Sequence, residues 1–133
     1  MGAATNYLEN KILDHILGNS AYSAPSKVYV GLATGVSEAG VVTGEPSSGS
    51  YARVEVTNNA TNFPNAVDGS KSNGTAITFP EATGSWGTLT HVFISDASSG
   101  GNVLLYSELT VSKAVDTGDT VSFAIGSLTF NLD

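Results

Sequence analysis

Two histidines are the side chains of this sequence best suited to acid–base chemistry near neutral pH. A histidine that acts as the base of a hydrolase needs a nucleophile within hydrogen-bond distance and an acid that orients its ring. His15 falls in a predicted helix and His91 in a predicted strand, and no serine lies in a Gly-x-Ser-x-Gly elbow. We therefore expect both histidines to be packed or surface residues, and we expect no catalytic residue.

The carboxylates and polar loops contain no pattern typical of a metal or cofactor site. Calcium takes about six to eight oxygens from closely spaced ligands, whereas Asp116 and Asp119 simply flank Thr117-Gly118, where an aspartate more often hydrogen-bonds its own backbone. The segment Gly69–Ser72 lacks the upstream glycine of a phosphate-binding loop, and the chain has no cysteine for a thiolate zinc site. We expect no metal, no cofactor and no enzymatic activity.

The helix that carries His15 is predicted from about Asn6 to Leu17. Leu8, Ile12 and Ile16 recur at every fourth position, and this spacing places them on one helical face. Such an apolar stripe either covers part of a sheet or docks on a neighbouring subunit, and both alternatives are open at this point. The candidate protein-interaction residues are Tyr7, Leu8, Ile12 and Ile16.

Both ends of this helix carry sequence signals. Asn6 followed by Glu9 predicts a capping box, with Thr5 as the competing N-cap. At the other end, Gly18-Asn19 supplies residues that tolerate a positive φ and can end a helix.

After Gly18 the pattern changes to short β-branched and aromatic runs separated by turn residues. In Tyr51–Thr57 the alternation predicts Val54 and Val56, with Ala52, on a buried face and Arg53 and Glu55 on a solvent face. The other predicted strands are 27–32, 75–79, 88–95, 103–109, 120–125 and 128–132, and the segments 34–50 and 58–72 are predicted loops. In the strand 88–95, alternation places Leu89, His91 and Phe93 on one face and Thr90, Val92 and Ile94 on the other.

Composition limits the class of protein. The chain has 133 residues, a net charge of -7 and 13% charged residues, so an acidic surface disfavours binding to nucleic acid or to an anionic membrane. The series of short predicted strands separated by turns indicates a mainly β fold, an antiparallel β-sandwich or jelly roll with one N-terminal amphipathic helix. We expect a single domain over 1–133, with the helix at about 6–17 and the sandwich at about 26–133.

An ordered series of short segments extends this interpretation along nearly the whole chain. The segments are 6–10, 15–17, 28–32, 49–54, 72–80, 86–91, 96–105 and 118–123, among them Trp86-Gly87-Thr88 and Tyr51-Ala52-Arg53. In this series the chain resembles a family of small structural proteins of tailed bacteriophages, whose members are labelled tail-fibre or head-decoration proteins. The resemblance carries no catalytic motif, so it implies no active-site residue.

The resemblance implies a virion protein assembled in the host cytoplasm. Our first expectation is a capsid decoration or cement protein on the outer head shell, with the major capsid protein or other virion proteins as partners. A homo-oligomer is also expected, a trimer first, because assemblies of this kind are symmetric. The alternative is a tail-fibre or receptor-binding module, which would expose an aromatic platform such as Tyr22, Phe63 or Trp86 to the host surface.

Overall fold

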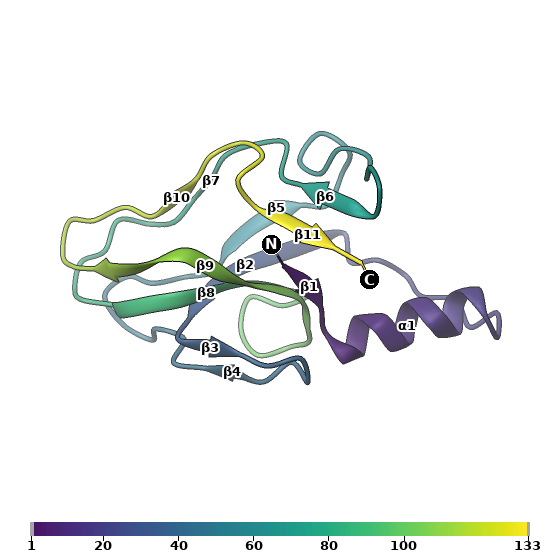
Figure 1. The fold of residues 1–133 in the computed structure, drawn as a ribbon. Coiled ribbons are helices and arrows are strands. Elements are labelled where there is room, and N and C mark those ends of the chain that lie inside the picture. The colour runs from purple at the N-terminus through teal and green to yellow at the C-terminus, as the bar shows by residue number, and fades with distance from the viewer. Residues whose placement is uncertain (1, 133) are drawn as a thin grey trace.

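The computed structural model describes residues 2–132, which form one helix and eleven strands (Figure 1). The helix α1 spans Asn6–Ile16. The strands are β1 (Ala3–Ala4), β2 (Lys27–Ala33), β3 (Gly35–Val36), β4 (Val42–Thr43), β5 (Val54–Thr57), β6 (Ser70–Ser72), β7 (Ile77–Thr78), β8 (Gly87–Ser95), β9 (Val103–Val115), β10 (Ser122–Phe123) and β11 (Thr129–Asn131). The fold is mainly β with antiparallel sheets and a single helix, which confirms the predicted fold class.

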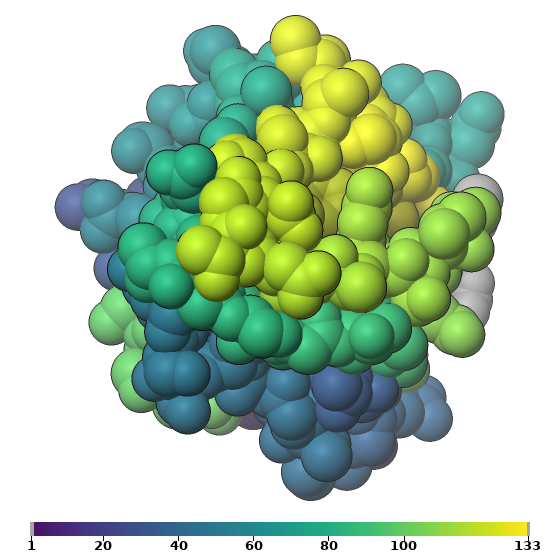
Figure 2. Space-filling view, turned by 90° about the vertical axis from the view of Figure 1, so that its left-hand side faces the viewer, coloured from purple at the N-terminus to yellow at the C-terminus, as the bar shows by residue number. Residues whose placement is uncertain are grey.

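The main layer is a five-stranded sheet in the order β1-β9-β8-β2-β5. Neighbouring strands are antiparallel, and Tyr29 lies opposite both Glu55 of β5 and Ser95 of β8. Two-stranded ladders β7-β10 and β6-β11 lie across this sheet as the second layer (Figure 1). In Figure 2, which faces the end of the molecule away from α1, the yellow-green residues around 115–122 lie beside the green residues around 80–90, in line with the hydrogen bond from the N–H of Ala82 to the backbone oxygen of Asp119.

The core lies between these layers. One face of β2 contributes Val28, Val30 and Leu32, and the second layer contributes Phe79 and Phe130 to the same cluster. The other face of the sheet buries a smaller cluster made of Ala33, Val36, Phe93 and Val103, next to the β3-β4 ladder. Both faces of β2 are therefore covered, which explains its nearly continuous apolar sequence.

A β-bulge changes the predicted faces of β8. The register with β9 shifts between Leu89 and His91, so one residue is added to one strand of the ladder. Leu89 consequently packs in the same cluster as Val92 and Ile94, whereas Phe93 packs in the smaller cluster. The prediction that Leu89 and Phe93 share a face was therefore wrong, because strict alternation ends at the bulge.

Two further sequence predictions require correction. The segments 34–50 and 58–72, predicted as loops, contain the ladder β3-β4 and strand β6. Strand β5 begins at Val54, so Ala52 and Arg53 precede it; Ala52 is exposed, and only 4% of the Arg53 side chain is. The alternation fails there because tertiary hydrogen bonds, rather than strand geometry, set the orientation of Arg53.

Candidate protein-interaction surface

The base of α1 is fixed to the main sheet by Thr5. This residue is fully buried, and its hydroxyl donates a hydrogen bond of 2.6 Å to the backbone oxygen of Val103. The hydroxyl oxygen of Thr5 in turn accepts from the backbone N–H of Leu8, so Thr5, the competing cap in the sequence, is the N-cap, and the predicted capping box at Asn6 was wrong. A buried cap bonded to β9 holds the first turn of the helix in a defined direction.

The far end of α1 leads into a return segment that runs back along the helix. Gly18 and Asn19 have φ values of 124° and 53°, which confirms their predicted role in ending the helix. The N–H of Ser20 donates to the backbone oxygen of Asp14, and the N–H of Tyr22 donates to Nδ1 of His15 at 3.2 Å. We call residues 6–26 the arm, since helix and return segment together extend from the body (Figure 1).

The predicted interaction residues lie at different depths along the arm. Tyr7 and Leu8 are half-buried and pack against the core, and Ile12 is also half-buried. Ile16 is 69% exposed. The other two apolar residues of the outer end, Leu13 and Leu17, are 57% and 73% exposed. The stripe thus covers the body at its inner end only, and we call Leu13, Ile16 and Leu17 the tip.

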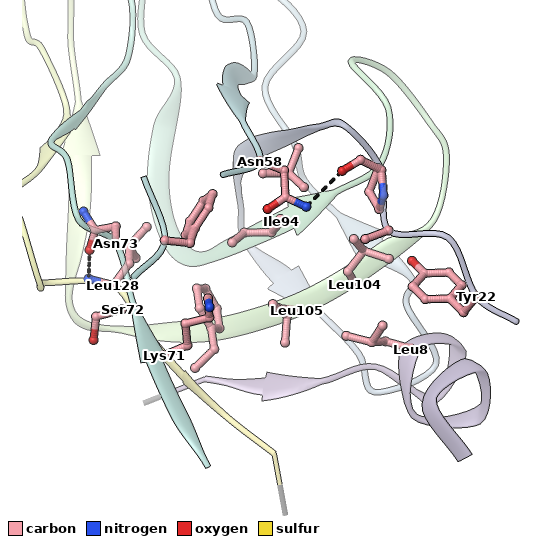
Figure 3. A pocket seen from close by; sticks show the side chains of 15 residues that line it. Leu8, Tyr22, Asn58, Lys71, Ser72, Asn73, Ile94, Leu104, Leu105 and Leu128 are labelled. Atoms are coloured by element: carbon pink, nitrogen blue, oxygen red, sulfur yellow. Dashed lines mark hydrogen bonds between the residues drawn. The ribbon is translucent and has the colours of Figure 1, made fainter. Parts of the chain in front are cut away.

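A cavity of about 180 Å³ opens beside the base of the arm (Figure 3). Leu8 from α1, Leu104 from β9 and Tyr22 from the return segment border it on the arm side. Ala24 and Pro25 of the return segment also line it. The remaining lining residues come from the body and are Val28, Asn58, Phe63, Lys71, Ser72, Asn73, Ile94, Leu105, Leu128 and Phe130. We call this space the arm cavity; its walls are predominantly apolar.

Sequence reasoning did not predict the arm cavity. Its walls come from segments far apart in the chain, and the contacts that join them are tertiary. For example, the Asn58 side chain donates to the backbone oxygen of Pro25 at 2.9 Å, and the N–H of Leu128 donates to Oδ1 of Asn73 at 3.0 Å (Figure 3). No local pattern in the sequence signals such a space.

The histidines are held in structural hydrogen bonds. Nδ1 of His91 lies 2.8 Å from the hydroxyl oxygen of Thr90, and that hydroxyl donates to the backbone oxygen of Thr34 at 2.7 Å. Since the Thr90 proton is committed to a carbonyl, the Thr90 oxygen accepts from His91, which is the reverse of an activated nucleophile. His15 accepts from the backbone of Tyr22 and so stabilises the arm.

The most extensive polar cluster surrounds Arg53. Its guanidinium makes two hydrogen bonds to the carboxylate of Glu45, of 2.8 and 2.9 Å, and also donates to the backbone oxygens of Ala97 and Gly100. The Tyr51 hydroxyl donates to the same carboxylate at 2.7 Å. Burial raises the pKa of Tyr51 well above its ordinary value, and the bond to Glu45 raises the pKa of Arg53. This cluster joins two loops to the sheet.

Among residues 2–132, no group of three or more His, Cys, Asp or Glu side chains is placed to hold a metal ion. Oδ2 of Asp119 accepts from the N–H of Asp116 at 2.9 Å, which confirms the predicted turn role of this pair. Within the described part of the chain, no helix has the length and apolar character needed to span a membrane.

A family model described as podophage GP4 fiber I protein gp80 matches residues 3–131. The chain belongs to this family. It is therefore a structural protein of a phage virion, as the resemblance implied. The search of curated proteins found no match.

The match covers both the arm and the body, so the exposed tip lies within the region common to the gp80 family model. Trp86, one of the aromatics predicted for an exposed platform, is only 6% exposed, and its indole N–H donates to the backbone oxygen of Gly49. It packs edge-on against Tyr51 and belongs to the core of this gp80-family protein.

Proposed function

We propose that this protein is a subunit of a podophage fibre and that it acts by non-covalent contact with other virion proteins. The observation that carries the proposal is the match over 3–131 to a family described as a fiber protein. The exposed apolar tip supports it, because a cluster of apolar side chains that projects into solvent from a folded body is typical of a surface that contacts another protein.

The proposed role includes no catalysis and no cofactor. The chemistry of the described polar groups supports this part: Thr90 donates to a carbonyl, and Glu45 is occupied by Arg53 and Tyr51. On this proposal the copies are made and assembled in the host cytoplasm. They associate with one another and with further virion components, and neither nucleic acid nor membrane is a partner.

Immunogold electron microscopy of intact phage particles tests the position. An antibody against the folded body is expected to label fibres and to leave the head shell unlabelled. The copy number, measured by quantitative gel electrophoresis against the major capsid protein, provides an independent readout, because a fibre subunit is present in far fewer copies than a shell protein. Label spread over the head would contradict the proposal.

Capsid decoration, the first expectation from the sequence, stays a prediction, and the fibre assignment replaces it as the proposal because it fits the family description. The same labelling and copy-number measurements distinguish the fibre and decoration hypotheses. Label on the head shell, together with hundreds of copies per particle, would favour decoration. A receptor-binding role within the fibre is tested separately by binding of the purified, labelled chain to host cells.

A further inference from the structure

The arm has an apolar tip that is exposed, and an unfilled apolar cavity lies between the base of the arm and the body. The tip residues Leu13, Ile16 and Leu17 are each more than half exposed. The arm cavity, of about 180 Å³, is bordered by Leu104 and Phe130 among other apolar side chains. An apolar cavity of about 150 Å³ accommodates benzene, so this space is large enough for the side chain of an isoleucine or leucine.

The tip cannot fill the cavity of its own chain. Ile16 follows Leu8, which lines the cavity, by eight positions, a rise of about 12 Å along the helix axis. The buried Thr5 cap and the bond from Tyr22 to His15 hold the helix in its outward direction. Entry of the tip into the same cavity would require the helix to unwind, so the occupant must come from another molecule.

Charge favours a second copy as that occupant. Lys71 lines the arm cavity, and Asp14 lies next to the tip in sequence. The ion pairs found among residues 2–132 are Lys27–Glu55 and Arg53–Glu45, so both Lys71 and Asp14 are available for pairing between molecules. Copies with a net charge of -7 repel one another, and an acidic element that meets a basic one offsets part of this repulsion and favours one orientation of the contact.

We infer that the tip of one copy inserts into the arm cavity of a second copy, with Asp14 facing Lys71 across the contact. The two surfaces differ, so the contact is head-to-tail: repetition closes a ring if the rotation between copies is suitable and otherwise builds a filament. This goes beyond the proposed function, because the contact concerns copies of the chain wherever they are located in the virion.

Sedimentation velocity of the full chain over a range of concentrations tests this contact. The unsubstituted protein is expected to associate reversibly, and Ile16→Gln is expected to raise the dissociation constant by about tenfold or more, because an apolar anchor is lost. Ile125→Gln is the matched control: Ile125 is 70% exposed, as Ile16 is at 69%, but lies outside both surfaces. Circular dichroism verifies that each variant is folded.

Mixing two defective variants tests the head-to-tail geometry. Ile16→Gln keeps a working cavity, and Ala24→Trp, at an exposed cavity residue, blocks the cavity but keeps a working tip. Each variant alone is expected to be monomeric at concentrations where the unsubstituted chain associates, and an equimolar mixture is expected to form a one-to-one complex. A tip-to-tip contact would not be restored by mixing, so the absence of this complex would overturn the inference.

Charge exchange tests the proposed ion pair. Asp14→Lys and Lys71→Glu are each expected to weaken association, and the double variant is expected to recover it, since the pair is restored with its signs reversed. A monomer at every concentration, or equal effects of Ile16→Gln and Ile125→Gln, would overturn the inference. Neither result would bear on the location of the protein in the virion, which the labelling experiment measures independently.

Discussion

Arg53 in the body and Ile16 in the arm reverse the usual arrangement of charged and apolar side chains. Arg53 is charged, yet its side chain is only 4% exposed, whereas Ile16 is apolar and 69% exposed. Each follows from its surroundings. Four hydrogen bonds satisfy the guanidinium, which also lies over the ring of Phe93 at 4.9 Å, and none of the described residues buries the outer end of α1.

The difference separates the requirements of folding from those of assembly. A buried charge is tolerated only if it is paired, so the polar cluster of Glu45, Tyr51 and Arg53 is required by the fold itself. An exposed apolar side chain, by contrast, contributes little to the stability of the isolated chain. Substitutions in the two regions should therefore affect different measurements: the free energy of unfolding in the body and association in the arm.

The largest effect is expected from Arg53→Met. It leaves the Glu45 carboxylate without its two charged hydrogen bonds and removes the donors to Ala97 and Gly100, so the free energy of unfolding should fall by about 3 kcal/mol. Urea unfolding followed by circular dichroism measures this loss.

The matched control is Lys27→Met, which removes the ion pair of 3.4 Å between Lys27 and Glu55. Both of these side chains are 52% exposed, so the change should cost less than about 0.5 kcal/mol. If Arg53→Met lowered the free energy of unfolding no more than Lys27→Met does, the buried polar cluster would not stabilise the body, and the contrast between body and arm would be wrong.

The next largest effect is expected at the junction of the two regions. Thr5→Val keeps the side-chain shape but removes the helix cap and the hydrogen bond to Val103, which should cost about 1–2 kcal/mol. The helical circular dichroism signal should also decrease before global unfolding. Thr57→Val, at an exposed position in β5, serves as the control, and an equal loss in both variants would show that the cap does not hold the arm.

The longer strands and the helix were predictable because their sequences repeat with a clear period. The run from Lys27 forms β2, and the apolar spacing of Leu8 and Ile12 forms α1. Strands of two or three residues, such as those at Val42 and Lys71, present too short a window for any period. Tertiary pairing alone creates them.

The candidate interaction surface was predictable only in part. The apolar stripe identified Ile16, but how far a helix projects beyond its sheet depends on where its cap is buried, here at Thr5. The cavity, with Lys71 in its wall, arises from packing between distant segments. The burial of Arg53 likewise depends on Glu45, eight residues earlier, and on the backbone oxygen of Ala97 in a distant loop, so no strand pattern could indicate it.

A smaller effect on the body is expected at alkaline pH. Burial raises the pKa of Tyr51 in the folded state, whereas an unfolded tyrosine titrates at about pH 10. A raised folded pKa gives stability that is complete below pH 10 and is lost as the pH rises toward the folded value, with a loss of about 1 kcal/mol by about pH 11. Urea midpoints measured at about pH 8 and pH 11 follow this loss.

Tyr51→Phe isolates this contribution. The pKa values of Tyr22 and Tyr106 are also raised by burial, so part of the alkaline loss should remain in the variant while the share of Tyr51 disappears. An identical pH dependence in both proteins would show that Tyr51 does not require its proton for the fold.

The smallest effect on unfolding is expected from Ile16→Ala. Because Ile16 is 69% exposed and alanine favours helix, the free energy of unfolding of the dilute chain should change by less than about 0.5 kcal/mol. Ile77→Ala removes the same atoms from a side chain that is 2% exposed, and it should cost about 2–5 kcal/mol. Urea unfolding at low protein concentration compares them.

The dependence of the melting temperature on protein concentration then shows whether the tip takes part in association. If the tip is buried only between copies, association stabilises the folded chain by mass action, so the melting temperature of the unsubstituted protein should rise with its concentration. In Ile16→Ala this rise should be weaker, although the dilute proteins unfold alike. A cost above 1 kcal/mol in the dilute variant would instead mean that Ile16 already packs within its own chain, and the contrast with Arg53 would fail.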